Sequence, residues 1–500
     1  MMKRDLDRCI KTHFDVLVIG GGINGAAIAH MAALNGLKTC LLEKQDFASG
    51  TSSKSTKIVH GGLRYLENFE FSLVKEALKE RTIQLRNVPH LIKPLGFIIP
   101  IYKNDGRPLW FMKLGVFVYD LLSGKYRIKK RRSLNAAEIE HLVPGIKSEG
   151  LTGGIMYYDG QMDDARLVLE NVLSAREKGA CVLNYAEVVA PIKQLGKTIG
   201  VQVRDAISGK EFPIKAKKIV AAVGPWTDIF LRKENAQAPQ KVRTTKGIHI
   251  VYRGQVAEHA LLIPIKKDHR VFFVIPWHGN SLIGTTDTDY SGDPDKVNAE
   301  EEDIEYLFTE ARRIFPSVDF KKEDIITTFA GLRPLVFEEG HPSKLSREHT
   351  IDQSYSGITY VYGGKYTTYR KIADEVLKTL MTRPPIDAGE HYPLYGSGEI
   401  NVSVADVAKE AGLDPKIVER LMNMYGSRYV DVLKLTEENP RLKELIVPGP
   451  PFIKAQIVYA IRTEMAQKAE DILERRLGLI YEDCDLAQCR HVIEEFLKPA

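Results

Sequence analysis

The N-terminal part of the chain contains two short apolar runs separated by a stretch of small residues. The apolar run Asp15–Ile19 predicts a buried strand of a parallel sheet. Residues Ile23–Asn35 are mostly small and apolar and are closed by Gly36, which predicts a helix. The run Lys38–Glu43 predicts a second strand. Strand, helix and strand in this order are the usual opening of a doubly wound α/β sheet.

The middle of the chain mixes helical periodicity with short alternating runs. The helical spacing of apolar residues predicts helices at Phe71–Val88, Asp163–Lys178 and Ala299–Phe315. Alternating runs between turn signals predict antiparallel strands between Ala186 and Val223, with a buried strand at Lys218–Val223, and again between Val242 and Thr286. Further strands near Ile325 and Thr359 lead into a helix from about Thr367.

The composition changes after Met381. Residues 382–399 form a linker rich in Pro and Gly, and the pattern that follows is helical to Ala500, with Ser403 and Asp414 as N-caps. We therefore expect a large N-terminal region at 1–385 and a helical domain at 386–500.

Length and composition restrict the class of protein. A chain of 500 residues is too long for one simple core, so we expect about two or three domains. A net charge of +5 over this length argues against a nucleic-acid binder dominated by global charge. The N-terminus has acidic residues and no apolar segment of a secretory signal, and no window is apolar over the roughly 18 residues of a membrane span. We expect an intracellular protein that does not span the membrane.

The cysteines indicate neither a disulfide framework nor a metal site. Cys9, Cys40, Cys181, Cys484 and Cys489 are odd in number and scattered, so no disulfide framework is expected. Cys484 and Cys489 lie near each other without a cluster of other Cys or His residues, so no metal site is expected there.

A glycine-rich turn follows the first strand directly, in the pattern Gly20-x-Gly22-x-x-Gly25. Gly20 permits a tight turn, Gly22 lets a pyrophosphate approach the backbone, and Gly25 allows close packing of helix on strand. The helix N-terminus then receives the phosphates. Glu43 ends the second strand about 20 residues later, where a carboxylate holds ribose hydroxyls. The motif predicts dinucleotide binding, and by itself it fits FAD as well as NAD.

Two further stretches distinguish these cofactors. TSSKSTKIVHGGLRYLE (Thr51–Glu67) follows the ribose carboxylate, and VYGGKYTTYRK (Val361–Lys371) lies far downstream. With them the chain resembles the FAD-dependent glycerol-3-phosphate dehydrogenases, within the amino-acid-oxidase-like flavoproteins. One departure is Val223, which has no hydroxyl where such flavoproteins commonly have Thr, although the turn itself can persist. The matching stretches, in family order, are Gly20–Gly25, Thr51–Glu67, Asp163–Leu169, Gly224–Trp226, Gly247–Ile250, Ile283–Asp287, Gly331–Pro334 and Gly363–Arg370.

The resemblance implies FAD as cofactor. It also implies an α/β FAD-binding domain within a chain that is α+β overall and ends in an all-α domain. A doubly wound FAD-binding domain, at about 13–66, 145–225 and 325–385, is expected to interleave with an antiparallel substrate domain at about 67–144 and 226–324. The turn Gly363–Thr368 is expected to open a helix whose N–H groups stabilise negative charge on reduced flavin. The cofactor contacts that we expect are Gly20, Gly21, Gly22, Asn24, Gly25, Glu43, Thr51, Ser52, Ser53, Gly224, Gly364, Lys365 and Thr367.

The implied reaction oxidises sn-glycerol 3-phosphate to dihydroxyacetone phosphate, with hydride passing from C2 to the flavin and electrons passing to quinone. Arg64 and Arg333, supported by Lys365 and Tyr65, are expected to bind the phosphate, because the arginine fork matches phosphate oxygens. His60 and His249 are alternative general bases, since the pKa of histidine suits this task near neutral pH. The other histidine would then hydrogen-bond the substrate.

Three rival functions share parts of this pattern. An oxidase acting on the same substrate would pass electrons to dioxygen and form peroxide. A FAD-binding module without turnover would leave two arginines and two histidines unexplained, and an NAD dehydrogenase would leave TSSKSTK and GGKYTT unexplained.

The segment Leu109–Arg132 raises the question of membrane contact, because a mostly apolar stretch precedes a strongly basic one. It fits either an interfacial helix with an anchor for anionic lipid or a buried helix followed by a solvated loop. The family resemblance favours the membrane surface. We expect a cytoplasmic enzyme, peripheral at the inner face of the cell membrane, with glycerol 3-phosphate and quinone as partners and a homodimer as an option.

Overall fold

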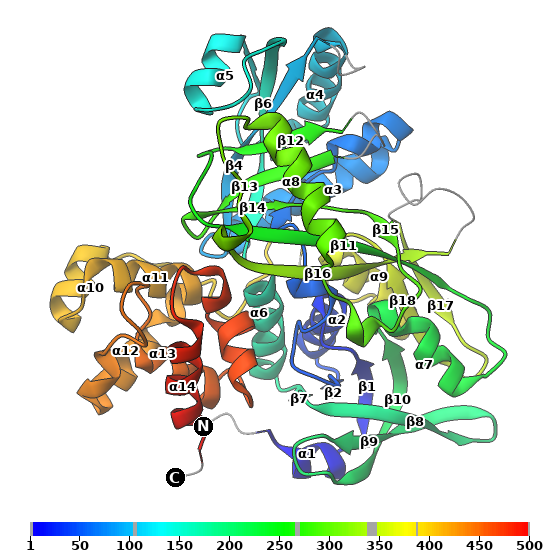
Figure 1. Ribbon diagram of the computed structural model, residues 1–500. Helices are drawn as coiled ribbons and strands as arrows, with labels where there is room; N and C mark the ends of the chain where they lie inside the picture. The colour runs from blue at the N-terminus through cyan, green and yellow to red at the C-terminus, as the bar shows by residue number, and fades with distance from the viewer. Residues whose placement is uncertain (1–3, 104–107, 266–270, 338–347, 387–388, 499–500) are drawn as a thin grey trace.

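The computed structural model describes residues 4–103, 108–265, 271–337, 348–386 and 389–498, which form two sheets and a C-terminal helical region (Figure 1). The first sheet grows from the N-terminal strand–helix–strand unit. Its path runs in the order β17 (His349–Gln353), β18 (Ile358–Gly363), β10 (Glu211–Ala221), β1 (Phe14–Ile19), β2 (Thr39–Leu42) and β7 (Cys181–Leu183). The pairs from β18 to β7 are parallel, and β17 is antiparallel to β18. An antiparallel extension of β10 consists of β9 (Lys197–Asp205) and β8 (Ala186–Gln194).

Small side chains explain the packing of helices on this sheet. Helix α2 (Ile23–Leu34) lies between α6 (Asp164–Glu177) and α9 (Tyr369–Leu380). Nearly all of its residues are buried, and many are alanines, which let neighbouring helices approach on every side. The carboxyl ends of β1 and β2 and the N-terminus of α2 are therefore held rigidly together at the carboxyl end of the parallel strands.

The second sheet is largely antiparallel and is covered on both faces. Helix α8 (Glu301–Ile314) and α5 (Ala136–Leu142) pack into the core on one face. Helices α3 (Phe71–Asn87) and α4 (Leu109–Ser123) pack on the other. The main path runs β15 (Thr288–Asp289), β11 (Val242–Tyr252), β14 (Asn280–Gly284), β13 (Val271–Trp277), β12 (Ala260–Pro264), β4 (Ile92–Tyr102), β6 (Leu151–Met162), β3 (Ile58–Val59). In addition, β16 (Ile325–Val336) pairs with β11, and β5 (Arg132–Leu134) pairs with β6.

The C-terminal helical region, residues 389–498, has a hydrophobic core of its own. The side chains of Ser403 and Asp414 accept hydrogen bonds at two helix starts, which confirms both predicted N-caps. Buried ion pairs join the region to the first sheet and its helices, among them Arg166–Glu464 and Arg476–Asp46. Its helices are α10 (Val404–Ala411), α11 (Pro415–Tyr425), α12 (Tyr429–Glu438), α13 (Lys454–Arg462) and α14 (Leu486–Leu497).

The predicted fold class is confirmed, and the predicted helices end within about two residues of the observed ones. Part of the predicted linker, residues 387–388, lies outside the described residues, and the predicted domain boundaries stay predictions. Within the described ranges, no helix is long and apolar enough to cross a membrane. The same ranges hold no group of three or more His, Cys, Asp or Glu residues placed to bind a metal ion.

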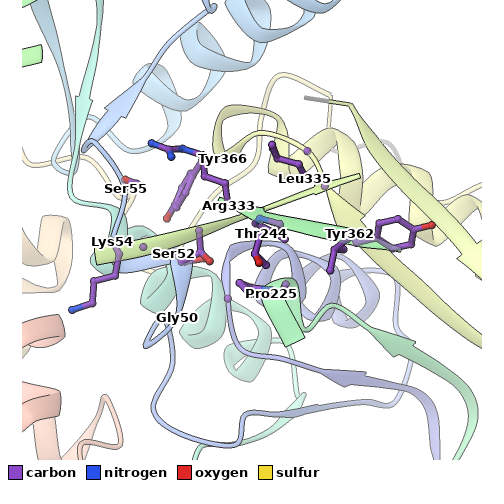
Figure 2. A pocket seen from close by; sticks show the side chains of 18 of the residues that line it. Gly50, Ser52, Lys54, Ser55, Pro225, Thr244, Arg333, Leu335, Tyr362 and Tyr366 are labelled. Atoms are coloured by element: carbon purple, nitrogen blue, oxygen red, sulfur yellow. The ribbon is translucent and has the colours of Figure 1, made fainter. Parts of the chain in front are cut away.

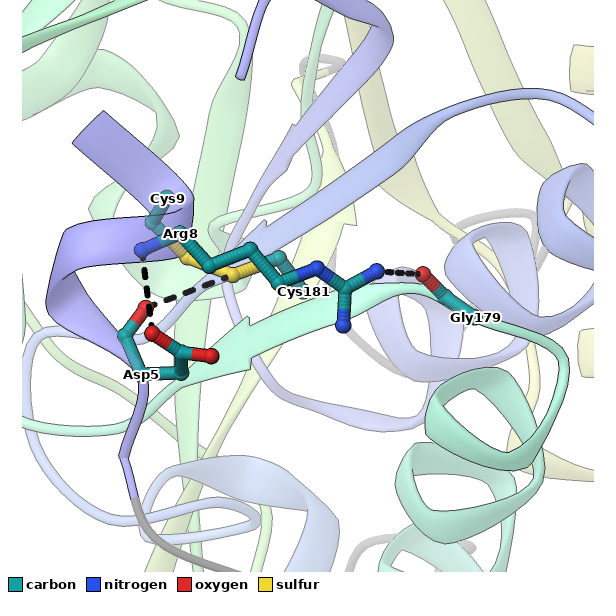
Figure 3. The surroundings of a disulfide bond; sticks show 5 residues. All are labelled: Asp5, Arg8, Cys9, Gly179 and Cys181. Atoms are coloured by element: carbon teal, nitrogen blue, oxygen red, sulfur yellow. Dashed lines mark hydrogen bonds between the residues drawn. A yellow bond between two sulfur atoms is a disulfide. The ribbon is translucent and has the colours of Figure 1, made fainter. Parts of the chain in front are cut away.

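The described part of the chain contains one disulfide, which the scattered cysteines did not predict. Cys9, in α1 (Leu6–Lys11), is bonded to Cys181 at the start of β7 (Figure 3). The Arg8 guanidinium donates to the carbonyl of Gly179 at 2.6 Å, which ties the same helix to the turn before β7. The two cysteines are 172 positions apart, and only the packing of α1 against the sheet edge brings them together. Cys484 and Cys489 remain thiols, with their sulfurs 3.7 Å apart.

Candidate active site

A cavity of about 1580 Å³ runs from the edge of the first sheet to the inner face of the second. The turn after β1, the end of β2, the loop that follows it, and strands β11 and β16 all contribute to its wall. Figure 2 shows Ser52 and Ser55 of that loop near Arg333 of β16 and Tyr366 of the turn after β18. Segments far apart in the sequence thus meet at one site.

The three motif glycines serve different purposes. A Cβ on Gly20 would lie 2.4 Å from the carbonyl oxygen of Ala222, and one on Gly25 would lie 1.9 Å from that of Gly20. These two glycines are therefore required by the fold itself. A Cβ on Gly22 would meet nothing closer than the Ser52 hydroxyl at 3.1 Å. Gly22 lines the cavity as the N-cap of α2, so its missing side chain leaves room for a ligand at the positive end of the helix.

Glu43 lies at the end of β2, on the wall of the cavity, as predicted from the ribose-binding position. Its carboxylate accepts hydrogen bonds from the N–H of Gly21 at 2.6 Å and from the N–H of Gln45 at 2.9 Å. Burial raises the pKa of the Glu43 carboxyl, and these two N–H groups act in the opposite direction. The same carboxylate therefore shapes the glycine turn and offers oxygen acceptors to the cavity.

The hydroxyl groups in the loop after β2 differ in their hydrogen bonding. Thr51 donates to the carbonyl of Leu332 at 2.6 Å, and Ser52 accepts from the N–H of Ile23 at 3.0 Å. The Ser53 hydroxyl is buried and has no partner among the described residues, and the same holds for the Asn24 side-chain oxygen. Buried polar atoms of this kind usually have partners. Asn24 lines the cavity, so a ligand can reach its oxygen, whereas Ser53 is not among the cavity-lining residues.

Two other turns of the predicted cofactor site also reach the cavity. Gly224, with φ +53°, and Val223 line it, so the turn exists without the hydroxyl that a Thr would add. Gly364, with φ +83°, and Lys365 line it from the segment between β18 and α9. The Thr367 hydroxyl is instead held by the backbone of His60, at 3.2 Å from both its N and its O.

The predicted phosphate-binding residues gather on the cavity wall, where Arg333 is held by hydrogen bonds. Its guanidinium donates to the Thr285 hydroxyl at 2.9 Å and to the Asp287 carboxylate at 3.2 Å. A Cβ on Gly247 of the neighbouring strand would lie 2.4 Å from this guanidinium, so the glycine makes room for it. Lys365 Nζ lies 3.5 Å from the centre of the Tyr65 ring, and Arg64 also lines the cavity. The structure therefore places these cationic side chains around one cavity.

His249 is buried on β11, and its environment is defined by three neighbours. Its Nε2 lies 3.0 Å from the Thr56 hydroxyl, and its ring stacks on Phe329 at 5.0 Å with an interplanar angle of 18°. A Cβ on Gly284 would lie 2.3 Å from the imidazole, so the ring fills the space that this glycine leaves. Burial, and then the cations Arg333 and Lys57, hold the pKa of His249 well below its ordinary value. His249 is therefore neutral at physiological pH.

His60 is half-buried and lines the same cavity from the loop before Arg64. Both candidate bases thus reach the site, and the choice between them stays open. Three residues near His249 were not predicted: Thr56 contacts its Nε2, Lys57 helps to lower its pKa, and Tyr481 contacts the Phe329 ring that stacks on it. Thr56 and Lys57 lie inside Thr51–Glu67, one of the stretches that carry the family resemblance. That stretch could have pointed to both residues. Nothing in the sequence pattern marks Tyr481.

Comparisons with known proteins agree with this geometry. Residues 15–370 match the family profile of FAD dependent oxidoreductases, and residues 388–497 match that of the C-terminal domain of alpha-glycerophosphate oxidase. The chain is 38% identical over 502 residues to glycerol-3-phosphate dehydrogenase of Synechocystis sp., covering 95% of this chain and 90% of the relative. It is 36% identical to the aerobic glycerol-3-phosphate dehydrogenase of Staphylococcus epidermidis, with 94% and 87% covered.

The chain belongs to the family of FAD-dependent glycerol-3-phosphate dehydrogenases. Among solved structures, glycerol-3-phosphate dehydrogenase from Bacillus halodurans complexed with FAD superposes with a TM-score of 0.81 at 30% identity, covering 99% of this chain and 92% of that one. L-alpha-glycerophosphate oxidase from Mycoplasma pneumoniae, at 19% identity and a TM-score of 0.59, shows the same fold over 77% of this chain.

FAD is the cofactor of this dehydrogenase family member. The cavity fits it in three respects. Gly22 leaves space at the helix N-terminus, where a pyrophosphate is stabilised by free N–H groups. Glu43 presents a carboxylate to the cavity after β2, where the motif predicts ribose binding. The buried side-chain oxygen of Asn24, which lines the cavity, lacks a partner within the described residues.

Proposed function

We propose that the protein oxidises sn-glycerol 3-phosphate to dihydroxyacetone phosphate and passes the electrons to quinone. The observation that supports this substrate most strongly is that Arg333 and His249 line the same cavity. The arginine is fixed by Asp287 and Thr285, and it is close enough to His249 to lower the pKa of the imidazole. A cation suited to phosphate and a neutral imidazole suited to accepting a proton therefore line one cavity, from the paired strands β16 and β11.

The roles of the residues follow from that arrangement. Arg333, with Arg64 and Lys365, binds the substrate phosphate and places the secondary alcohol beside the histidines. His249 or His60 takes the hydroxyl proton as the C2–H bond breaks and the ketone forms. FAD, when bound, supplies the acceptor for the hydride. Bound phosphate also offsets the positive charge of Arg333, which makes His249 a better proton acceptor once substrate is present.

The choice of electron acceptor is tested by turnover with each acceptor separately. Protein reconstituted with FAD and given glycerol 3-phosphate should reduce a soluble ubiquinone analogue under nitrogen, and should form little peroxide in air. Rapid peroxide formation without quinone reduction would establish the oxidase instead. That second candidate is favoured by the match of residues 388–497 to an oxidase C-terminal domain.

We also propose that α4 attaches the protein to an anionic membrane surface. One face of this helix exposes a set of large apolar side chains, while the basic segment 129–132 follows it in the chain. The Arg131 guanidinium lies 5.1 Å from the Phe117 ring, so the basic segment stays beside the helix. The exposed apolar residues, with their exposed fractions, are Trp110 (66%), Phe111 (41%), Leu114 (52%), Phe117 (46%) and Leu121 (64%).

The opposite face of α4 belongs to the active-site wall. Met112 lines the cavity, and the Tyr119 hydroxyl accepts from the N–H of Gly61 at 2.8 Å and contacts the Asp159 carboxylate at 2.9 Å. A helix with its outer face in lipid and its inner face on the cavity would place the site near membrane-dissolved quinone. This supports quinone over dioxygen as the acceptor.

Cosedimentation with vesicles tests the attachment. Replacing Lys129, Lys130, Arg131 and Arg132 by Gln should weaken binding to phosphatidylglycerol vesicles by about 1 kcal/mol per charge that reaches the surface. Binding that is unchanged, or absent in the native protein, would contradict the proposal. The matched control removes four exposed lysines of the β9–β10 edge, which lies at the opposite end of the molecule in Figure 1: Lys197, Lys210, Lys215 and Lys218.

A further inference from the structure

One segment of the C-terminal helical region reaches into the second sheet behind His249. Its central residue is Tyr481, which is 5% exposed. The carbonyl of Tyr481 accepts from the Asn280 side chain at 3.1 Å. The next residue, Glu482, pairs with His278 at 2.6 Å and with Arg420 at 3.0 Å. The segment is therefore attached to the β13–β14 hairpin at Tyr481 and at Glu482.

The ring of Tyr481 braces the aromatic residues next to the histidine. It meets Phe329 and Trp277 edge-on, with centroids 6.1 Å apart in each case. Phe329 in turn stacks on His249. Edge-to-face and stacked contacts at these distances are favourable and directional. A shift of the Tyr481 ring would therefore move His249 through one intervening ring, that of Phe329.

Tyr481 is also one of the partners that surround a buried lysine. Lys57 is 1% exposed, and its Nζ lies 2.6 Å from Asp164 Oδ1 and 3.4 Å from the Tyr481 hydroxyl. Its ammonium lies 5.1 Å from the centre of the Tyr481 ring and 5.2 Å from that of Phe329. A buried cation needs such a complete set of partners, since an unpaired one is strongly destabilising.

The lysine holds the loop that contacts the histidine. Lys57 Nζ donates to the Ser53 carbonyl at 2.7 Å, and the second oxygen of Asp164 accepts from the Ser55 hydroxyl, also at 2.7 Å. Thr56, between these anchored residues, places its hydroxyl 3.0 Å from His249. Two chains of contacts therefore link Tyr481 to His249. One passes through Phe329, and the other passes through Lys57 and this loop.

We infer that Tyr481 is a positioning residue for His249, so that the C-terminal helical region completes the active site. The inference rests on the proposed function, because it assigns a consequence for the oxidation of glycerol 3-phosphate. Without the Tyr481 ring, Phe329 loses its edge contact and water can reach Lys57. The imidazole would then shift relative to the substrate while Arg333 keeps its own contacts with Asp287 and Thr285.

The test compares Tyr481→Ala with Tyr481→Phe, which keeps the ring. In Tyr481→Ala, the anaerobic rate of flavin reduction at saturating glycerol 3-phosphate should fall about 10- to 100-fold, with little change in KM. Tyr481→Phe should restore most of the rate. Tyr429→Ala is the matched control, since Tyr429 is buried in the core of the same region and is no part of these contacts. If Tyr481→Ala does not fold, Tyr481→Leu replaces it.

A second readout does not depend on activity. Titration of ¹⁵N-histidine-labelled protein should show the pKa of His249 moving up toward its ordinary value in Tyr481→Ala, because its burial is relieved. Native-like rates and an unshifted His249 signal in Tyr481→Ala would overturn the inference. An equal loss of rate in Tyr429→Ala would overturn it too. Native protein whose flavin is not reduced by the substrate refutes the proposed function instead, and the histidine titration then still tests the bracing.

Discussion

Replacing Arg333 by Ala separates substrate binding from chemistry. The native guanidinium is oriented by the Thr285 hydroxyl and the Asp287 carboxylate, at 2.9 and 3.2 Å. The substitution removes charge-assisted hydrogen bonds to the phosphate, worth about 1.5–3 kcal/mol. That corresponds to a loss of about 10- to 150-fold in kcat/KM for glycerol 3-phosphate. Plain glycerol has no phosphate, so its slow oxidation should change little.

The assay measures kcat/KM for both substrates with an artificial electron acceptor. Arg333→Lys keeps a charge beside Asp287, so it should lose less than Arg333→Ala. Arg243→Ala is the matched control, because Arg243 lines the same cavity from β11 while its guanidinium binds Asp289 at 2.6 and 2.7 Å. An equal loss for glycerol and glycerol 3-phosphate in Arg333→Ala would refute the phosphate role.

Three further predictions follow from the glycines, the buried histidine and the disulfide. Gly22→Val should yield folded protein without flavin colour, whereas Gly25→Ala, with its Cβ 1.9 Å from a backbone carbonyl oxygen, should lower Tm; a yellow Gly22→Val protein would contradict this. The pKa of His249 is lower in the folded protein than its ordinary value of 6.5. As the pH falls, the unfolded chain therefore binds a proton at this histidine before the folded protein does, and the free energy of unfolding decreases below about pH 6.5. His249→Gln should flatten this fall in Tm, and if His249 is the base it should also abolish the acid limb of flavin reduction, which lies well below pH 6.5 because burial lowers the pKa of the folded histidine; an unchanged pH dependence of Tm would count against the buried neutral state. Breaking the Cys9–Cys181 bond with Ser substitutions should cost about 2–5 kcal/mol in urea unfolding, and labelling of all five cysteines in denatured, unreduced protein would show that the bond is absent.

Local patterns were enough to predict many of the elements and the cofactor turn, although α1, β4 and β6 were not predicted. The run before Gly20, the small residues of α2 and Glu43 lie within one strand–helix–strand unit, so spacing alone predicts their arrangement. Helix caps such as Ser403 and Asp414 are equally local. The placement of Arg333 and His249 at one cavity required the family resemblance, because it depends on the pairing of β11 with β16.

Contacts between distant segments could not be predicted from the sequence. Lys57 and Tyr481 are 424 positions apart, and their contact arises only because the C-terminal helical region docks on the β13–β14 hairpin. The Cys9–Cys181 bond likewise depends on how α1 lies against the edge of the first sheet. Periodicity specifies which face of an element is buried, and it carries no information about which distant side chain meets that face.

Anaerobic titration with glycerol 3-phosphate tests the central claim most directly. Protein reconstituted with FAD is mixed with the substrate in a sealed cuvette while the visible absorbance of the flavin is recorded. The proposed function predicts that the flavin bleaches and that dihydroxyacetone phosphate forms with it, mole for mole. A flavin that stays oxidised in excess glycerol 3-phosphate, while dithionite still reduces it, would contradict the proposed function.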